Sequence, residues 1–246
     1  MGSEISTSIV TATLNERGNV LQFVKRVHAA MGKATYEILV VDDNSNDGTT
    51  DLLEEISVSD PSVRTIINSR RTGLLESNLR GLKESRGEIK IIIDADLQHP
   101  PEMIPRIVSR IKDGTDAVVM SRFVEGSSTD KRNAYRASAT SLAIALCHLI
   151  VPQTRNFKDP ISGFFAIGKE VAIPYERLFT SIRNRRGYKI LVPIIANNVN
   201  KKFVEVPYYF DARRWGESKI GSENLLIPRF LTELSWYRSL FRETAF

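Results

Sequence analysis

The chain has very few side chains that form disulfides or bind soft metals. Its single cysteine, Cys147, excludes an internal disulfide and leaves nothing to pair with in a zinc cluster. The three histidines, His28, His99 and His148, are scattered along the 246 residues. No soft-metal site is therefore indicated.

Long apolar runs are also absent. The longest candidate, 139–151, falls short of the roughly 18 residues of a spanning helix and contains His148. Residues 1–6 lack the charged and apolar regions of a secretory signal. We therefore expect a cytoplasmic protein, placed peripherally on the cytoplasmic face of a membrane.

A glycine-rich dinucleotide turn is missing. Such a fold needs Gly-x-Gly-x-x-Gly directly after its first strand, whereas residues 14–19 read LNERGN, which disfavours a nicotinamide dehydrogenase. A phosphatase with an aspartyl nucleophile is disfavoured as well, because its Asp-x-Asp usually follows the first strand and here follows the fourth.

The chain carries a net positive charge. A net charge of +5 and a pI near 9.3 favour anionic partners such as nucleotide phosphates, nucleic acid or acidic lipid. Outside Arg183, Arg185 and Arg186 the basic residues are dispersed. A nucleic-acid-binding face is therefore not expected.

Strand-like and helix-like segments alternate through the first half of the chain, which predicts one α/β domain with a doubly wound sheet. The expected strands are 8–13, 37–41, 63–67, 89–93 and 117–120, and the expected helices are 20–31, 49–56, 74–84 and 102–113. The second half is less regular. It predicts a helix over 135–151, a strand over 161–167 in which Gly163 allows close backbone approach, and a strand over 203–206.

The tail, residues 223–246, has an amphipathic pattern. Its apolar side comprises Leu226, Phe230, Leu234, Tyr237 and Phe241. Three arginines lie among them: Arg229, Arg238 and Arg242. Such a helix either packs on the domain or lies in a bilayer interface, and the pattern leaves both open.

The most informative stretch is IIIDADLQHPPE at 91–102. An apolar run without a polar face suits a buried strand, with Asp94 and Asp96 at its carboxyl end. Residues one apart point the same way on an extended chain, so both carboxylates, with the Gln98 amide oxygen, can bind one Mg²⁺ or Mn²⁺ that holds a diphosphate. The alternative is that Asp94 and Asp96 are simply the first polar residues of a surface loop and bind no metal.

Polar residues follow four of the predicted strands: Asn15 and Glu16, Asp42 and Asp43, Asp94 and Asp96, and Ser121 and Arg122. Ligands of a doubly wound sheet bind outside the carboxyl ends of its strands, so these loops predict one shared crevice.

Five segments in order resemble the inverting glycosyltransferases of family 2. They are VVDDNSNDGT at 40–49, DADLQHPPE at 94–102, SRF at 121–123, DPISGFFA at 159–166 and RRWGESK at 213–219. Within that family the chain is most similar to the branch of dolichyl-phosphate mannose synthase and other polyprenyl-phosphate hexosyltransferases. The similarity runs from about residue 8 to residue 220.

The resemblance implies a GT-A fold, in which helices flank a Rossmann-like, mostly parallel central sheet. The transferase domain would comprise 1–221 and the amphipathic tail 222–246. The implied partners are a nucleotide-sugar donor, a polyprenyl or dolichyl phosphate acceptor, a membrane surface and a separate membrane-anchoring subunit. The implied cofactor is Mg²⁺ or Mn²⁺ at Asp94, Asp96 and Gln98.

The resemblance also implies the site residues. The expected catalytic set is Asp94, Asp96, Arg122, Asp159 and Arg213. The expected substrate-binding set is Ala12, Asn15, Glu16, Asp42, Arg80, Gln98, Arg136, Thr140 and Lys219. The side chains expected to hold phosphates are Arg122, Arg213 and Lys219. Asp42 would meet the nucleobase and Arg136 the acceptor phosphate. Alternatively, Asp42 caps the following helix and Arg136 is a solvated charge.

The chain departs from the family pattern after the first strand. Ala12, Thr13 and Leu14 stand where the family commonly has Pro-x-Tyr, which removes an aromatic contact to the nucleotide and leaves the base specificity open. Thr140 occupies the place where relatives often carry serine.

The expected function is a metal-dependent, inverting transfer of a hexose, with mannose from GDP-mannose as the main hypothesis, to dolichyl or polyprenyl phosphate. The alternatives are a UDP-glucose donor, a sugar-hydroxyl acceptor with Asp159 as general base, and a non-catalytic binding domain. Retention of Asp94 and Asp96 counts against the last.

Overall fold

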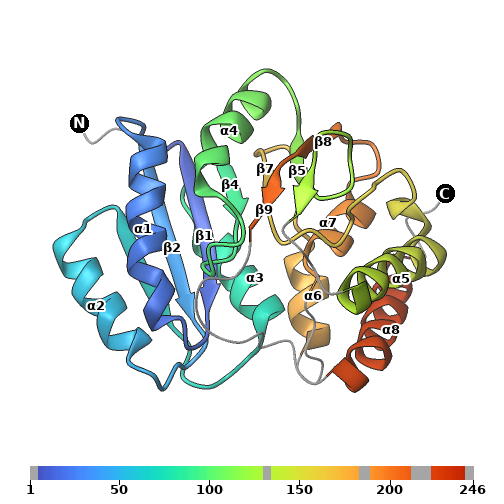
Figure 1. Cartoon of the computed structure of the whole chain (residues 1–246), viewed down its shortest axis with the longest axis horizontal. Helices are drawn as coiled ribbons and strands as arrows, with labels where there is room; N and C mark the ends of the chain where they lie inside the picture. Colours follow the sequence, from blue (N-terminus) through green and yellow to red (C-terminus); the bar gives the residue numbers. More distant parts are fainter. Residues whose placement is uncertain (1–4, 130–133, 183–188, 212–222, 242–246) are drawn as a thin grey trace.

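A seven-stranded sheet forms the centre of the fold, and helices cover both of its faces (Figure 1). The computed structural model describes residues 5–129, 134–182, 189–211 and 223–241. The strands of the main sheet are β1 Thr7–Thr13, β2 Tyr36–Asp42, β3 Val63–Ile67, β4 Ile89–Ile92, β5 Ala117–Ser121, β7 Phe165–Ile167 and β8 Phe203–Pro207. A two-stranded sheet pairs β6 Ser128–Thr129 with β9 Tyr209–Phe210.

The strand order is β3-β2-β1-β4-β7-β5-β8. Every neighbouring pair is parallel except those that involve β7, which runs antiparallel between β4 and β5. The sequence-based prediction of a mostly parallel sheet is therefore confirmed. The carboxyl ends of β1, β2, β4 and β5 meet at one edge, where ligands of such sheets bind.

The described α-helices are α1 Arg17–Met31, α2 Thr49–Ser59, α3 Leu74–Glu84, α4 Ile104–Lys112, α5 Ala134–Ile150, α6 Tyr175–Ile182, α7 Leu191–Asn197 and α8 Glu223–Leu240. Two 3₁₀ turns, η1 Pro101–Met103 and η2 Pro152–Thr154, precede α4 and follow α5. Apolar side chains of α1, α2 and α4 pack on one face of the sheet, and those of α3, α5, α7 and α8 belong to the cluster on the other. Burial on both faces explains the apolar centres of strands such as β2 and β5, at residues 38–41 and 117–120.

Helix α3 shows how closely the layers approach. A side chain at Gly81 would collide with Val10 of β1 and Val41 of β2. Only glycine leaves the α3 backbone room to lie this near the sheet.

The predicted elements are found with altered bounds in several cases, and the strand at 161–167 changes most. The bounds of β3 and α3 are those predicted. The predicted strand 161–167 shortens to β7, because Asp159 and Ser162 form a turn in which the Ser162 N–H donates to the Asp159 carbonyl at 3.2 Å.

Helix α8 packs beside α5 (Figure 1). Its predicted apolar side is confirmed at four positions, which are buried: Phe230, Leu234, Tyr237 and Phe241. These side chains belong to the same core cluster as β1 and β5. None of the helices in the described parts of the chain is long and apolar enough to cross a membrane.

Candidate active site

The carboxyl ends of β4 and β5 and the loop before β7 bring three predicted site residues into one region. Asp94 follows β4, Arg122 follows β5, and Asp159 lies in the loop that leads to β7. Gly163 packs against this group, because a Cβ atom there would lie 2.9 Å from Asp94 Oδ2. The prediction that Gly163 allows close approach is thus confirmed.

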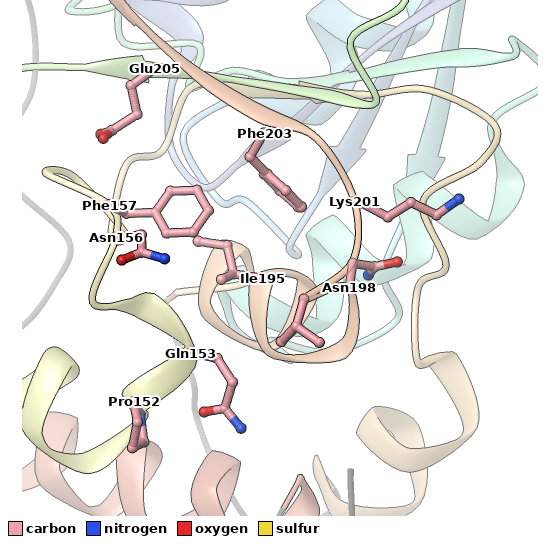
Figure 2. Close-up of a pocket in the computed structure, with 10 residues that line it drawn as sticks. Pro152, Gln153, Asn156, Phe157, Ile195, Asn198, Lys201, Phe203 and Glu205 are labelled. Carbon is pink, nitrogen blue, oxygen red and sulfur yellow. The ribbon is translucent and has the colours of Figure 1, made fainter. Parts of the chain in front are cut away.

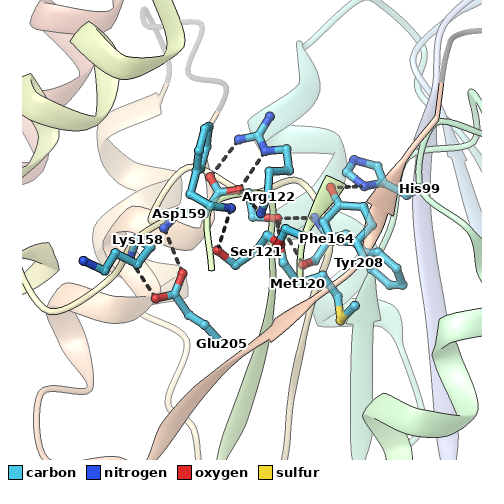
Figure 3. A network of polar contacts seen from close by, with 12 residues as sticks. His99, Met120, Ser121, Arg122, Lys158, Asp159, Phe164, Glu205 and Tyr208 are labelled. Carbon is cyan, nitrogen blue, oxygen red and sulfur yellow. Dashed lines mark hydrogen bonds and ion pairs between the residues drawn. The ribbon is translucent and has the colours of Figure 1, made fainter. Parts of the chain in front are cut away.

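Arg122 and Asp159 form a bidentate ion pair (Figure 3). The guanidinium donates to the carboxylate from Nε and from Nη2, each at 2.7 Å, and the Arg122 backbone N–H adds a third bond of 3.1 Å. Burial alone lowers the pKa of Arg122, but the hydrogen bonds and charge of Asp159 outweigh it and raise this pKa. The guanidinium therefore stays charged, with one edge fixed and Nη1 directed elsewhere.

Asp159 itself has no exposed surface. Both of its carboxylate oxygens are engaged by Arg122. A general base must reach the proton that it removes, so this placement argues against Asp159 as the base for a sugar hydroxyl. Asp159 instead orients Arg122.

The Asp-x-Asp segment is a turn rather than an extension of the strand. β4 ends at Ile92, and residues 95–96 lie in a turn, so the extended-chain argument for aligned carboxylates does not apply. Leu97 has a left-handed φ of 64°, and the Gln98 N–H donates to Asp96 Oδ1 at 3.1 Å. A left-handed leucine costs about 1 to 2 kcal/mol. Such backbone strain is concentrated at functional sites.

The buried imidazole of His99 lies against the Asp94 carboxylate. It is 3% exposed, its Nε2 lies 3.4 Å from Asp94 Oδ2, and its Nδ1 lies 3.0 Å from the Tyr208 hydroxyl (Figure 3). The rings of Phe164, Tyr208 and Phe210 surround the imidazole. The Tyr208 hydroxyl and the three rings therefore fix the imidazole beside Asp94.

The predicted nucleobase residue, Asp42, is fully buried at the end of β2. Its oxygens accept hydrogen bonds from Thr13, from the Ser45 backbone and hydroxyl, and from Thr50. The alternative that Asp42 caps the following helix is wrong, because the N-cap of α2 is Gly48 and the first backbone N–H of the helix, that of Thr49, donates to Asp47 Oδ1 at 3.0 Å. The nucleobase contact stays a prediction.

The loops after β1 and β2 are tied together beside Asp42. The Asn15 N–H donates to Ser45 Oγ at 2.8 Å, and the Glu16 N–H donates to Thr49 Oγ1 at 3.0 Å. Asn15 has a left-handed φ of 53°, which asparagine tolerates. Ala12 pairs with Val41 just before these loops.

The remaining predicted substrate-binding and phosphate-binding residues either lie elsewhere in the fold or fall outside the described residues. The exposed Arg80 donates to Asn68 Oδ1 at 2.6 Å beyond β3, away from β4 and β5. Thr140 is a partly buried residue of α5. Arg213, Lys219 and the Arg136 side chain lie outside the described residues.

Comparison with known families decides the identification. Residues 8–190 match the profile described as Glycosyl transferase family 2. The chain belongs to this family. Four of the five resembling segments lie within this match, and RRWGESK at 213–219 lies beyond it.

Two relatives of this family 2 chain are named dolichol-phosphate mannosyltransferase. The protein of Pyrococcus furiosus is 38% identical over 90% of this chain, which spans 61% of that protein. The protein of Mycosarcoma maydis is 31% identical over 89% of this chain and 74% of its own length. Among solved structures, glucosyl-3-phosphoglycerate synthase from Mycobacterium tuberculosis, in a complex with Mn²⁺, UDP and glucosyl-3-phosphoglycerate, superposes with a TM-score of 0.64. It is 19% identical, over 97% of this chain and 80% of its own, which shows a shared fold.

The oxygen atoms of Asp94, Asp96 and Gln98 suit a hard cation that is also bound by a substrate. Within the described residues no group of three or more His, Cys, Asp or Glu side chains is placed to hold a metal. Asp94 and Asp96 supply two carboxylates, and the Gln98 amide nitrogen donates to the Asp211 carbonyl at 3.3 Å, so its amide oxygen is the atom that would bind a cation. Mg²⁺ is typically bound by one or two carboxylates together with substrate phosphates, so these residues fit it.

The contact of Tyr208 with His99 predicts a measurable effect on metal binding. Tyr208→Phe removes the hydroxyl that contacts His99 beside Asp94, and if Asp94 binds the cation we expect Mn²⁺ affinity to fall by about tenfold or more. Mn²⁺ affinity in the presence of GDP, measured by electron paramagnetic resonance, is the readout. Tyr209→Phe, at the neighbouring and half-exposed tyrosine, is the control. Equal Mn²⁺ affinity of Tyr208→Phe and the unchanged chain contradicts this prediction.

Lys189 is a half-buried basic residue whose electrostatic interaction with the predicted catalytic groups the sequence pattern did not indicate. Burial lowers its pKa, as does the positive charge of Arg122, whereas the charges of Asp94, Glu233 and Asp159 raise it. Its ammonium therefore lies within electrostatic reach of the predicted catalytic groups. No motif signalled it, since lysine before an apolar helix is an ordinary pattern.

Proposed function

We propose that the chain transfers a hexose, mannose from GDP-mannose, to a dolichyl or polyprenyl phosphate with inversion. The observation that carries the proposal is the Arg122–Asp159 pair beside Asp94, at the carboxyl edge of the sheet of a family 2 chain. The names of the Pyrococcus and Mycosarcoma relatives support the lipid acceptor and mannose.

Asp94, Asp96 and the Gln98 amide oxygen would hold Mg²⁺ or Mn²⁺ together with the donor diphosphate. When bound, the ion offsets the negative charge that develops on the leaving diphosphate. The Mn²⁺ and UDP complex of the M. tuberculosis structure supports a divalent ion in this fold.

The negative charge of the acceptor phosphate makes it a nucleophile without prior loss of a proton. A phosphate monoester is largely ionised at neutral pH, since its second pKa is about 6. One of its oxygens attacks the anomeric carbon, and the bonding pair of the broken C–O bond leaves with the nucleoside diphosphate. No proton has to be removed, so no general base is required. The fixed guanidinium of Arg122, with Arg213 and Lys219, would hold phosphates, and Arg136 would hold that of the lipid.

The test is a donor and acceptor screen. GDP-mannose, UDP-glucose and related donors are each offered with a short polyprenyl phosphate, and the product is identified by mass spectrometry. We expect a mannosyl lipid phosphate from GDP-mannose. A glucosyl product shifts the donor to UDP-glucose, and transfer only to sugar hydroxyls rejects the proposed acceptor.

A lipid acceptor implies contact with a membrane surface, and α5 offers one. Leu142 and Leu149 lie seven residues apart on this helix, with 45% and 68% of their surface exposed. Residues at this spacing lie on one helix face. The neighbouring α8 exposes Arg229 and Arg238, which lie about 180° apart around the helix. One of the two can therefore face the membrane, where it would add about 1 kcal/mol near anionic headgroups. We propose that this surface lies on the cytoplasmic side of a membrane.

The double variant Leu142→Glu, Leu149→Glu should bind anionic liposomes at least about tenfold more weakly, because two leucines lose their burial in the interface. Co-sedimentation measures the binding, which should also weaken as salt rises. Val58→Glu on α2, where the side chain is 89% exposed, is the control. If the unchanged chain binds no liposome, or the double variant binds equally well, the membrane contact is rejected.

A further inference from the structure

A carboxylate outside the predicted catalytic set holds the loop that carries Asp159. Glu205 lies on β8, the last strand of the sheet. One of its oxygens accepts the Lys158 N–H at 2.7 Å and the other accepts the Asp159 N–H at 2.8 Å. Two successive backbone amides are therefore fixed by one side chain that is 46 residues away in sequence.

The same loop then fixes Arg122. Figure 3 shows the Asp159 backbone between Glu205 on one side and the Arg122 guanidinium on the other. Asp159 is completely buried and bidentate to Arg122, so a shift of its backbone moves the guanidinium with it. The chain of contacts runs from the Glu205 carboxylate through the 158–159 backbone to the Arg122 side chain.

Glu205 borders a hollow that is separate from the described residues of the predicted site. This hollow of about 410 Å³ lies between η2, α7 and β8, and Phe157, Ile195 and Phe203 also line it (Figure 2). No described residue of the predicted catalytic or substrate-binding sets lines this hollow. Both oxygens of Glu205 are engaged by the backbone amides of Lys158 and Asp159, which assigns its carboxylate to holding the loop.

We infer that Glu205 is a positioning residue, which sets the orientation of Arg122 through the Lys158–Asp159 backbone. This inference rests on the proposed function, in which Arg122 holds a phosphate group. An anion-binding guanidinium loses its effect steeply when it is misplaced, by about a hundredfold for a 1 Å error.

The test compares Glu205→Gln with the unchanged chain. The amide keeps one acceptor oxygen but turns an NH₂ group toward a backbone N–H, so one of the two hydrogen bonds is lost. We expect kcat for sugar transfer to fall by about ten- to a hundredfold per folded molecule, with the KM for the donor nearly unchanged. Glu170→Gln, at a 65% exposed glutamate, is the matched control and should leave both constants unchanged.

A second readout separates this inference from the proposed function. The Nε–H resonance of Arg122, assigned by its loss in Arg122→Lys, reports the bond to Asp159 by NMR. It should shift and exchange faster with solvent in Glu205→Gln but not in Glu170→Gln. If the unchanged chain transfers no sugar, the proposed function fails and the resonance alone tests the inference. An unchanged resonance, or a kcat equal to that of the unchanged chain, overturns the positioning role.

Discussion

Asp96→Ala is expected to lower sugar transfer at least about a hundredfold. The loss is comparable to that of one strong electrostatic stabiliser of the transition state, because one of the two carboxylates available to the cation is removed. Asp96 is 6% exposed and its Oδ1 accepts the Gln98 N–H, so the substitution also loosens the turn that presents Gln98. Initial rates with saturating GDP-mannose and polyprenyl phosphate are the measurement.

Two controls make the Asp96 result specific. Asp113→Ala replaces an exposed aspartate at the end of α4 and should leave the rate unchanged. Urea unfolding of Asp96→Ala establishes that the variant is folded. If the variant turns over as fast as the unchanged chain, and does so in excess chelator, a metal-dependent mechanism at this site is wrong.

Asp159→Ala is expected to destabilise the fold by about 3 to 5 kcal/mol. The substitution leaves the Arg122 guanidinium, whose side chain is 12% exposed, as an uncompensated buried charge. The free energy of unfolding in urea measures the effect, provided that the transition is two-state. Sugar transfer should fall as well, because Arg122 loses the partner that orients it.

The exposed ion pair of Glu88 and Lys169 serves as the control for the buried pair of Arg122 and Asp159. Glu88 and Lys169 form an ion pair of 3.3 Å whose side chains are 65% and 64% exposed, so Glu88→Ala should cost no more than about 1 kcal/mol. The double variant Arg122→Met, Asp159→Ala should recover part of the lost stability, because an apolar replacement of a buried pair is often nearly neutral. Equal stability losses in Asp159→Ala and Glu88→Ala contradict the structural role of the buried pair.

Local pattern in the sequence determined most of the elements of this protein. Runs of apolar, β-branched residues predicted β1 to β5, and helical periodicity predicted the helices between them, with matching bounds for β3 and α3. The order of five short motifs indicated the family, which the match over 8–190 confirms. These signals are carried by neighbours within one or two turns or strands, which is why a sequence reveals them.

Pairing between distant segments was decided only by the tertiary structure. Strand β7 is inserted antiparallel between β4 and β5. Glu205 accepts a hydrogen bond from Asp159, which is 46 positions away in the sequence. The Tyr208 hydroxyl contacts His99, which is 109 positions away. A glutamate in a strand looks like any half-exposed charge until the opposing loop is in place. Alternation and spacing specify which face a residue occupies, whereas the partner that it meets there depends on how the strands and loops pack.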